Sequence, residues 1–452
     1  MFKIFGTDGV RCIVNSEPMT PDTCLKIAKA AGYLLAKNKS RRNRVIISKD
    51  TRLSGYLFEP LMTSGFISMG MDVILVGPLP TPALPMLISS MRADMGVMIT
   101  ASHNTYEYNG LKFFDNKGYK ISKKLESEIE KIVLNNKKYL KITNKNYVTG
   151  KALRLEDAQG RYSESLKLKL EKKVNFKKLK IVLDCGNGAT YSVAPTIFWE
   201  LGCEVITINN KPNGKNINLN CGAINVSELR KRVLDTNSEI GFAFDGDGDR
   251  IIVVDNKGNI IDGDRILAVF AKEFLKRKKL NKKTVVSTKM SNLGFENYLN
   301  NKLGVRLIRT DVGDINVIDE MIKKSYSLGG EQSGHIILSE YSNTGDGILV
   351  ALKILEVLSN YGKKSSNLFD IYKSYYQEQT NIFLKNKLSN KKSKFLKDIT
   401  INLNKKQNNM RFLVRESGTE PLVRLLVEGK NKEEVKKEII ILKNKIEKTI
   451  NA

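Results

Sequence analysis

The chain has 452 residues and a formal net charge of +27 at pH 7, with 75 Lys and Arg against 48 Asp and Glu. Hydrophobic residues make up 41% of it, a share that suits packed domains and excludes a disordered basic tail. The length favours about three domains. The charge would suit a nucleic-acid-binding protein, but most of it is lysine in segments rich in Asn and Ile, so charge alone identifies no partner.

The sequence shows no sign of a membrane span or a secretory leader. No run of about 20 apolar residues is uninterrupted, and the most apolar region, residues 69–87, is broken by Asp72 and several prolines. The N-terminus reaches Asp8 and Arg11 before an apolar core can form, so we expect a cytoplasmic protein that contacts no membrane. The 5 cysteines contain no C-x-x-C pair, and we expect neither a disulfide nor a zinc site.

Short runs rich in β-forming residues alternate with longer helical segments, a pattern typical of mostly parallel sheets with crossover helices. In a first α/β domain, residues 1–150, we expect strands at 45–47, 72–76 and 96–99 and helices at 56–69, 82–91 and 122–138. In a second, residues 151–252, we expect strands at 180–183, 204–208, 240–244 and 251–254 and helices at 189–201 and 227–234.

A third α/β domain, residues 253–362, repeats this order, with strands at 284–287, 305–308 and 326–328 and helices near 267–276, 293–299 and 348–358. The remaining residues, 363–452, begin with a polar stretch and continue with two strands at 411–414 and 422–427 around a turn. An amphipathic helix follows at 433–450. The expected fold class is therefore α/β, with three consecutive α/β domains of mixed, mostly parallel sheets plus a smaller C-terminal α+β domain.

The 2 histidines, His103 and His335, each lie in a segment rich in Gly, Ser or Asn near the end of a predicted strand. Open α/β sheets bind ligands at the carboxyl ends of their strands, and histidine carries protons at neutral pH. Either residue could equally be a structural histidine held by hydrogen bonds. Their common setting keeps a functional role open for both.

Asp245, Asp247 and Asp249 alternate with glycines between two predicted strands and are followed by Arg250. Three carboxylates at this spacing repel one another unless a hard cation binds them. A calcium loop of the EF-hand type is excluded, because it needs Gly and Glu where this chain has Arg250 and Asn256. An open Mg²⁺ site that also accepts a phosphate oxygen fits better, and a solvated acidic turn is the alternative.

A turn between the two C-terminal strands contains Arg415, Ser417, Gly418 and Thr419, and Arg424 follows it. A guanidinium, two hydroxyls and the N–H groups of such a turn suit a phosphate dianion, although a solvated hairpin has the same composition.

Lys112 is a candidate functional residue only because it lies shortly after Ser102 in the sequence. Cations and burial near a phosphate site lower the pKa of a lysine and suit it to act as a general base. These sites together predict phosphoryl transfer involving a phosphorylated polyol.

Seven motifs lie in one order along the chain, at residues 5–11, 49–52, 80–82, 100–104, 245–250, 329–335 and 415–421. In these motifs, and over nearly its whole length, the chain resembles the α-D-phosphohexomutase family. The resemblance implies a phosphoserine at Ser102, which gives its phosphoryl group to the free hydroxyl of a sugar phosphate. A 1,6-bisphosphate forms, the sugar reorients and the other phosphoryl group returns to Ser102.

The resemblance also implies roles for the residues of these motifs. Ser102, Asp245, Asp247 and Asp249 would hold one Mg²⁺ per chain. Lys112, with Arg11 near it, would be the base for the accepting hydroxyl, and His103 and Arg250 would steady the phosphoryl group. Glu331 and Ser333 would bind sugar hydroxyls, with His335 as a positioning or acid group. The phosphate that does not react would be held by Arg415, Ser417, Gly418, Thr419 and Arg424.

Residues 5–11 and 331–335 are most similar to the family members that act on glucosamine phosphates. This implies interconversion of glucosamine 6-phosphate and glucosamine 1-phosphate for UDP-N-acetylglucosamine synthesis, with glucosamine 1,6-bisphosphate as intermediate and activator. Glucose or mannose phosphates are the near alternative, and a basic nucleic-acid-binding protein on a mutase scaffold is the remote one. The expected partner is a small sugar phosphate, with no nucleic acid, and family relatives are often homodimers.

The chain departs from the family pattern at a few positions. Cys12 and Ser48 stand where Gly is usual, Thr105 where Pro is usual, and Ile315 and Asn316 where an Arg-Tyr pair is usual. Because the phosphoryl-handling motifs are intact, we expect these changes to affect loop rigidity and rate more than the type of reaction.

Overall fold

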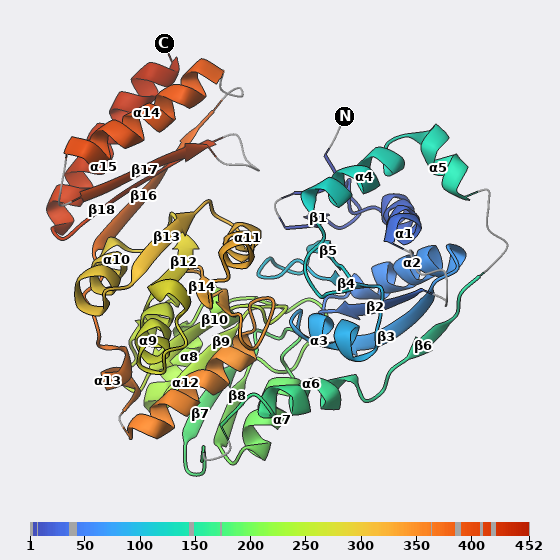
Figure 1. Cartoon of the computed structure of the whole chain (residues 1–452), viewed down its shortest axis with the longest axis horizontal. Helices are drawn as coiled ribbons and strands as arrows, with labels where there is room; N and C mark the ends of the chain where they lie inside the picture. The colour runs from blue at the N-terminus through green and yellow to red at the C-terminus, as the bar shows by residue number, and fades with distance from the viewer. Residues whose placement is uncertain are drawn as a thin grey trace.

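In the described part of the chain, four β-sheets follow one another in sequence order (Figure 1). The computed structural model describes residues 3–6, 8–35, 43–143, 149–171, 174–362, 364–384, 390–406, 410–416 and 422–451. The sheets are arranged around an arc, so that the C-terminal sheet and the N-terminal sheet flank an opening. The functional turns described below lie on the inner side of this arc.

The first sheet has the strand order β1-β5-β4-β2-β3-β6. Its strands are β1 (Val10–Ile13), β2 (Arg44–Lys49), β3 (Asp72–Pro78), β4 (Met95–Ile99), β5 (Tyr108–Phe114) and β6 (Ala152–Arg154). Strands β2, β3, β4 and β6 run parallel, and β5 is antiparallel to β4 and β1. The helices are α1 (Pro21–Leu35), α2 (Gly55–Ser68), α3 (Ala83–Ser90), α4 (Lys123–Val133) and α5 (Asn136–Thr143). Strand β4 is buried at every position, which explains its uninterrupted apolar sequence.

The second sheet has the order β11-β10-β9-β7-β8. It consists of β7 (Lys180–Asp184), β8 (Glu204–Ile208), β9 (Ile240–Phe244), β10 (Ile251–Asp255) and β11 (Ile260–Ile261). Its helices are α6 (Ala158–Lys167), α7 (Val193–Glu200) and α8 (Ser227–Asp235), with a 3-10 turn at Gly222–Ile224. Strands β7, β8 and β9 are parallel, and β10 folds back antiparallel to β9.

The third sheet has the order β13-β12-β14-β15 and repeats this plan. Its strands are β12 (Thr284–Thr288), β13 (Arg306–Thr310), β14 (Leu328–Gly330) and β15 (Ile336–Leu338), of which only β15 is antiparallel to its neighbour. The accompanying helices are α9 (Gly263–Lys276), α10 (Leu293–Tyr298), α11 (Asp314–Lys324), α12 (Gly347–Tyr361) and α13 (Ser365–Phe369). A 3-10 turn lies at Asn281–Lys283, and a π-helical turn at Leu299–Leu303 continues α10.

The C-terminal sheet is antiparallel throughout its described strands, in the order β16-β18-β17. Its elements are β16 (Tyr376–Phe383), α14 (Asn390–Lys406), β17 (Met410–Glu416), β18 (Leu422–Gly429) and α15 (Lys432–Asn451). The fold class expected from the sequence is therefore confirmed: three α/β units with mixed, mostly parallel sheets and a smaller α+β unit.

One hydrophobic cluster extends through the first three units, and the first unit has a second cluster around α1, α2 and α4. A continuous cluster of buried side chains includes Leu84 of α3, Phe242 of β9, Phe270 of α9 and Leu352 of α12. Helix α12, which belongs in sequence to the third unit, packs on β9 and β10 of the second. The C-terminal unit has a separate cluster around Val423 and Val435. The cluster that extends through the first three units therefore fixes the positions of their sheets relative to one another.

Three expectations for single elements were wrong. The helix expected at 122–138 is two helices, because Asn135 accepts a hydrogen bond from the Lys138 backbone N–H and starts a new helix. The helix expected at 189–201 begins only at Val193, because the preceding turn docks on the second sheet through Ala189 N–H and Gly246 O. The polar stretch after Asn360 contains β16 and α14, whose alternating polar residues mask their periodicity.

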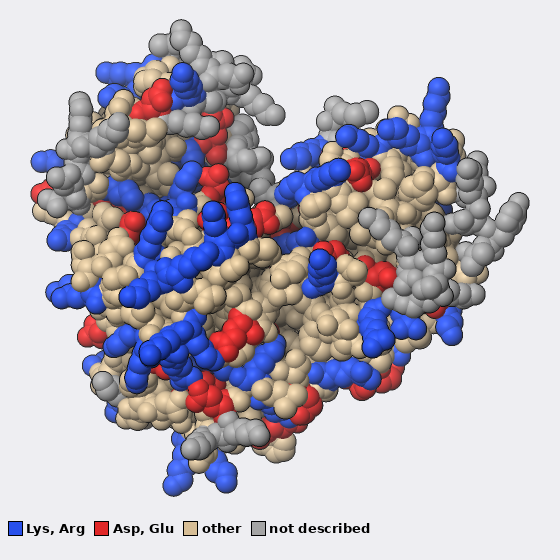
Figure 2. All heavy atoms as spheres, in the orientation of Figure 1, with Lys and Arg blue, Asp and Glu red and all other residues tan. Residues whose placement is uncertain are grey.

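The positive charge is spread over the molecule. Figure 2 shows Lys and Arg scattered over every part of the visible face, with Asp and Glu between them. The same view shows a hollow between the C-terminal unit and the first unit. Among the helices described, none is both long and apolar enough to cross a membrane.

Candidate functional site

The site is built from turns that occupy the same place in the first three units. Each turn follows the parallel strand β4, β9 or β14 and leads into the antiparallel strand beside it. These turns contain Ser102, the Asp245–Arg250 segment and the Glu331–His335 segment respectively. Because the three sheets share a core, the carboxyl ends of these strands face one common space, where open α/β sheets bind ligands.

Ser102 is buried and faces the second unit. Its hydroxyl donates a hydrogen bond of 2.7 Å to Asp245 Oδ2, and His103 Nδ1 lies 3.4 Å from the same hydroxyl. The backbone of Ser102 adopts the left-handed conformation, with φ at 50°. The serine predicted to carry the phosphoryl group therefore lies directly against the acidic turn predicted to bind a metal.

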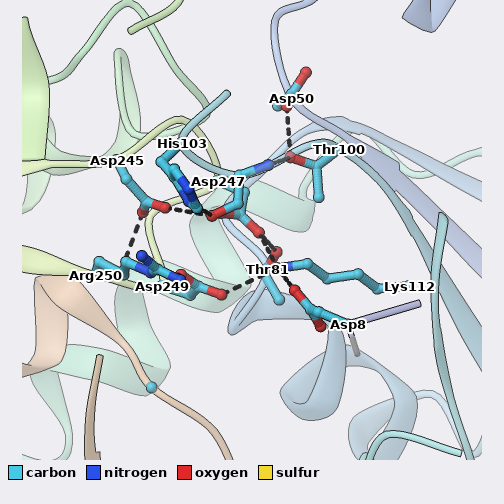
Figure 3. A network of polar contacts seen from close by, with 12 residues as sticks. Asp8, Asp50, Thr81, Thr100, His103, Lys112, Asp245, Asp247, Asp249 and Arg250 are labelled. Carbon is cyan, nitrogen blue, oxygen red and sulfur yellow. Dashed lines mark hydrogen bonds and ion pairs between the residues drawn. The ribbon is translucent and has the colours of Figure 1, made fainter. Parts of the chain in front are cut away.

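Asp245, Asp247 and Asp249 form a compact carboxylate cluster (Figure 3). All three are buried, and one oxygen from each lies within 4.8 Å of the others. Asp247 Oδ1 and Asp249 Oδ1 are buried acceptors without a hydrogen-bond partner among the described residues. An all-oxygen donor set with unsatisfied buried oxygens suits a hard divalent cation. The residues present can therefore hold such an ion.

Lys112 on β5 occupies the same cluster. Its ammonium donates to Asp247 Oδ2 at 2.8 Å and Asp249 Oδ2 at 3.1 Å and lies 3.4 Å from Asp8 Oδ2. Burial lowers the pKa of Lys112, but the surrounding carboxylates outweigh burial and hold the pKa well above its usual value. The lowered pKa expected from the sequence is therefore wrong for this arrangement, because the nearest groups are anions rather than cations.

His103 is kept neutral by its surroundings. Burial, followed by the charges of Arg250 and Arg11, lowers the pKa of His103 to about 4. Arg11 on β1 donates to Asn104 Oδ1 at 3.2 Å and pairs with Asp8 Oδ2 at 3.1 Å. The Nε of Arg250 is a buried donor with no hydrogen-bond partner in the described part of the chain. Two guanidinium groups and a neutral imidazole thus lie around the Ser102 turn.

The turn of the third unit brings two of its three predicted residues inward. Glu331 is buried, and its Oε1 accepts a hydrogen bond of 3.1 Å from the Gly313 N–H, whereas Ser333 is exposed at the turn. His335 is buried behind the carboxylate cluster, with Nδ1 3.7 Å from Asp249 Oδ1. The Gly345 N–H donates to His335 Nε2 at 3.2 Å, which places the proton of the neutral ring on Nδ1.

Gln332, which lies in the 331–335 motif, contacts the C-terminal unit. Its Nε2 lies 3.3 Å from Gln377 Oε1 on β16 and 3.4 Å from Asp262 Oδ2. Gln377 in turn donates to Glu428 Oε1 at 3.0 Å. The turn of the third unit is therefore connected to the sheet predicted to bind the second phosphate.

Arg415 and Arg424 face each other directly on β17 and β18. Burial, followed by the charge of Arg424, lowers the pKa of Arg415. Two guanidinium groups opposite each other repel unless an anion lies between them. Ser417, Gly418 and Thr419, predicted to complete this phosphate site, lie outside the described residues.

Several polar residues of the site were given no role by sequence reasoning. Thr81 Oγ1 donates to Asp247 Oδ2 at 2.5 Å, so the second residue of the Pro-Thr-Pro motif holds the acidic turn. Lys120 pairs with Asp8 and with Asp314 and joins the first unit to the third. Thr81 and Asp8 lie in the motifs at residues 80–82 and 5–11, and this position could have pointed to a role for them. Lys120 is one lysine in a lysine-rich chain and carried no such signal.

Family models for the four domains of phosphoglucomutases and phosphomannomutases match the chain in order. Alpha/beta/alpha domains I, II and III match residues 3–140, 160–258 and 262–375, and the C-terminal domain matches residues 389–439. The chain is 48% identical to a phosphoglucosamine mutase of Thermodesulfovibrio yellowstonii over 437 residues, which covers 96% of each chain. It is 46% identical to a phosphoglucosamine mutase of Zymomonas mobilis, over 95% of each chain.

Solved structures of more distant proteins share the fold. A phosphoglucomutase/phosphomannomutase family protein from Burkholderia thailandensis is 24% identical, with a TM-score of 0.81 over 96% of this chain and 94% of that one. An N-acetylphosphoglucosamine mutase from Aspergillus fumigatus, solved with GlcNAc-6P and magnesium, is 17% identical, with a TM-score of 0.64 over 97% and 94%. With all four domains matched in order and curated relatives close to half identical along its length, this chain belongs to the phosphoglucomutase/phosphomannomutase family, the α-D-phosphohexomutases.

Proposed function

We propose that this chain interconverts glucosamine 6-phosphate and glucosamine 1-phosphate through a phosphoserine at Ser102 and a glucosamine 1,6-bisphosphate intermediate. The observation that carries the phosphoryl-transfer part is the buried Ser102 hydroxyl, 2.7 Å from the carboxylate cluster. The choice of sugar is supported by the relatives named phosphoglucosamine mutase, which match nearly the whole chain.

Phosphoryl transfer on this site conserves all atoms and charges. The free hydroxyl oxygen of the sugar phosphate bonds to the phosphorus on Ser102, the bond from that phosphorus to Ser102 Oγ breaks, and the hydroxyl proton passes to a base. After the sugar reorients, Ser102 Oγ bonds to the phosphorus at the other position, the bond from that phosphorus to the sugar oxygen breaks, and the base returns the proton to that oxygen. Arg250, whose buried Nε lacks a hydrogen-bond partner among the described residues, and neutral His103 would steady the phosphoryl oxygens.

Ser102, Asp245, Asp247 and Asp249 would hold Mg²⁺, as the family resemblance implies and as their unsatisfied oxygens allow. When bound, such an ion neutralises negative charge on a transferring phosphoryl group. Thr81 orients Asp247, and His335 orients Asp249 from behind. Groups that fix the orientation of metal-binding side chains have a strong effect on metal affinity.

Lys112 remains our candidate for the base, on the condition that its raised pKa is lowered before the reaction. Burial lowers its pKa, but the carboxylates of Asp247, Asp249 and Asp8 outweigh burial and raise it. If those carboxylates share their charge with a bound divalent cation, the attraction that raises the pKa weakens. Lys112 is then able to release its proton and accept one from the sugar hydroxyl.

The third and fourth units would hold the part of the substrate that does not react. Glu331 and exposed Ser333 are placed to bind sugar hydroxyls, and Arg415 and Arg424 to bind the phosphate that does not react. The repulsion between these two guanidinium groups supports an anion site at this end of the sheet.

A comparison of three sugar phosphates tests the proposal. The Mg²⁺-loaded, phosphorylated protein should form glucosamine 1-phosphate from glucosamine 6-phosphate in a coupled assay, and its kcat/KM for glucosamine phosphate should exceed those for glucose and mannose phosphates. A higher kcat/KM for glucose or mannose phosphate would make the protein a sister mutase. No turnover of any of the three would contradict the proposed function.

A further inference from the structure

The backbone of Ser102 is held in a conformation that a serine rarely adopts. Its φ of 50° lies in the left-handed region, which is unfavourable for a non-glycine residue and persists only where the surroundings enforce it. Because the strained serine faces Asp245, other groups must hold its turn in place. Two side chains from different units supply it.

The first side chain is Arg52, which is buried behind the Ser102 turn. Its Nη2 donates to Ser102 O at 3.0 Å and to Asn104 O at 2.8 Å. Its Nη1 donates to Tyr108 O at 3.1 Å and also to Thr105 O. One guanidinium group thus binds four carbonyls of a single turn, which a lysine ammonium cannot do with the same geometry.

Arg52 is itself held from the side of the first sheet. Its Nε donates to Asp50 Oδ2 at 2.9 Å, and the same carboxylate oxygen accepts the Thr100 hydroxyl at 2.6 Å. Thr100 Oγ1 then accepts the Ser102 N–H at 2.9 Å. Both backbone polar groups of Ser102 are therefore connected to the Asp50–Arg52 pair.

The second side chain is Asn218, which comes from the second unit. Its Nδ2 donates to Ser102 O at 2.8 Å and to Asn104 O at 2.9 Å, the same two carbonyls that Arg52 Nη2 binds. Gly246, inside the acidic turn, packs against this point, since a Cβ there would lie 2.5 Å from Ser102 O and 2.7 Å from Asn218 Nδ2. Asn218 thus joins the serine turn to the carboxylate turn at close contact.

We propose that Arg52 and Asn218 are positioning residues for Ser102: they hold its carbonyl from two units at once and so keep the strained turn aimed at the Asp245–Asp249 cluster. The proposal rests on the proposed function, in which Ser102 carries the phosphoryl group. Neither residue touches the reacting atoms. Their effect on rate comes through the placement of Ser102 Oγ, and a misplacement of about 1 Å can cost about 100-fold in rate.

The loop that carries Asn218 offers a closely matched control. Asn220 lies two residues further on, has nearly the same left-handed backbone (φ 54° against 56°), and is exposed to solvent. Glycine adopts this conformation without strain, so Asn218→Gly and Asn220→Gly each remove one asparagine side chain at equal backbone cost. Only the first variant removes the bonds to Ser102 O and Asn104 O.

We expect Asn218→Gly to lower kcat about 10–100-fold with KM for the sugar phosphate changed less than about 2-fold, and Asn220→Gly to change neither. Hydrogen exchange of peptides covering residues 100–105 should become faster in Asn218→Gly and stay unchanged in Asn220→Gly. Arg52→Lys should show the same pattern as Asn218→Gly, because the ammonium retains the charge opposite Asp50 but loses most of the carbonyl bonds.

Equal kcat in the two glycine variants would overturn the proposal while leaving the proposed function intact. So would a fall in kcat that only follows a lower melting temperature and a lower folded fraction, because that result indicates a structural role alone. If the wild-type protein turned over no sugar phosphate, the proposed function would fail, and exchange at residues 100–105 would still show whether Asn218 and Arg52 hold the turn.

Discussion

Lys112 illustrates how the immediate neighbours of one residue decide its chemistry. The ammonium lies among Asp8, Asp247 and Asp249, which come from two different units and hold its proton tightly. Removing one member of a buried charge cluster leaves the others uncompensated, which costs about 3–5 kcal/mol. A divalent cation would bind the same two carboxylates, Asp247 and Asp249, so Lys112 and the cation draw on the same negative charge.

We therefore expect Lys112→Met to lower the melting temperature in EDTA and to respond to Mg²⁺ with a larger increase in melting temperature than the wild-type protein. Bound Mg²⁺ would replace the missing positive charge between Asp247 and Asp249. Lys120→Met is the control, because Lys120 pairs with Asp8 and Asp314 rather than with the cluster. Equal responses to Mg²⁺ in all three proteins would contradict a metal site on these carboxylates.

Asp184, at the end of β7, gives a prediction about pH. Burial raises the pKa of Asp184 to about 6, although it accepts hydrogen bonds from the Gly186 and Gly222 N–H groups. Because the folded state then binds the proton more tightly than the unfolded state, the stability from this group is full below about pH 4 and is lost as pH rises through about 6.

The Asp184→Asn variant cannot ionise at this position. Its melting temperature should therefore improve relative to the wild-type protein as pH rises from about 4 to about 6, and the difference should level off above that range. Thermal melts of both proteins at several pH values measure this. A constant difference across the range would mean that Asp184 has an ordinary pKa.

At the level of single residues, the motifs that carry the chemistry could be predicted from the sequence. The residues that hold these motifs in position could not. Ser102 and the three aspartates stand in short motifs whose spacing alone suggests a metal and a phosphoryl carrier, and the structure brings them together. Asn218 lies in an asparagine-rich segment of an asparagine-rich chain, and nothing in its neighbours indicates a bond to a turn 116 residues earlier. Lys112 was found by position, but its pKa depends on groups brought in by folding.

At the level of elements, one arrangement recurs: a parallel strand, a functional turn and an antiparallel return strand. It occurs at β4–β5, β9–β10 and β14–β15. The buried strands could be predicted because both faces are covered and the sequence is uniformly apolar. Strand β16 and helix α14 could not, because they are partly exposed and their sequences are mostly polar.

The pair Arg415 and Arg424 on β17 and β18 leads to a prediction in which stability and binding respond in opposite directions. Replacing Arg415 with Gln relieves the repulsion, so the melting temperature should stay the same or rise. The KM for the sugar phosphate should rise about 10-fold or more, because a charged hydrogen bond to the phosphate is lost. Melting curves and steady-state kinetics on the same preparation test both parts. An unchanged KM would exclude Arg415 from the phosphate site.

At the scale of the whole molecule, the packing of the hydrophobic core groups the units in a way that their order in the sequence does not show. One apolar cluster extends through the first three units, the first unit has a second cluster, and the C-terminal unit has a separate one. The C-terminal unit meets the third through polar contacts made by Arg411 and Glu428, which are ion-paired with each other. Glu428 accepts the Leu293 N–H at 2.7 Å, and Arg411 donates to Ser291 O at 2.9 Å. The sequence predicts four units but not which of them share a core, because that depends on where α12 and α3 pack.

Native-state hydrogen exchange should reflect this division. Amides of β7, β9, β12 and β14 should open together at one high free energy, and those of β16 and β18 should open at a lower one, because a separately packed unit can open by itself. Measurements in increasing denaturant below the unfolding transition distinguish the two groups. A single opening free energy for both groups of strands would show that the C-terminal unit is as firmly integrated as the second and third units.

At this scale, the net charge of +27 says little about how the substrate is recognised. The lysine surplus is scattered over the visible surface, whereas Arg11, Arg250 and Arg415 lie at or near turns predicted to handle phosphate. We therefore attribute recognition of the anionic substrate to a few placed cations and not to the overall field.

The central claim is that Ser102 carries the phosphoryl group, and intact-mass spectrometry tests it most directly. After incubation with glucosamine 1,6-bisphosphate and Mg²⁺, the wild-type protein should gain the mass of one phosphoryl group. That mass should disappear on phosphatase treatment, and Ser102→Ala should not gain it. A Ser102→Ala protein that acquires the same phosphoryl group, or a wild-type protein that acquires none, would contradict the account.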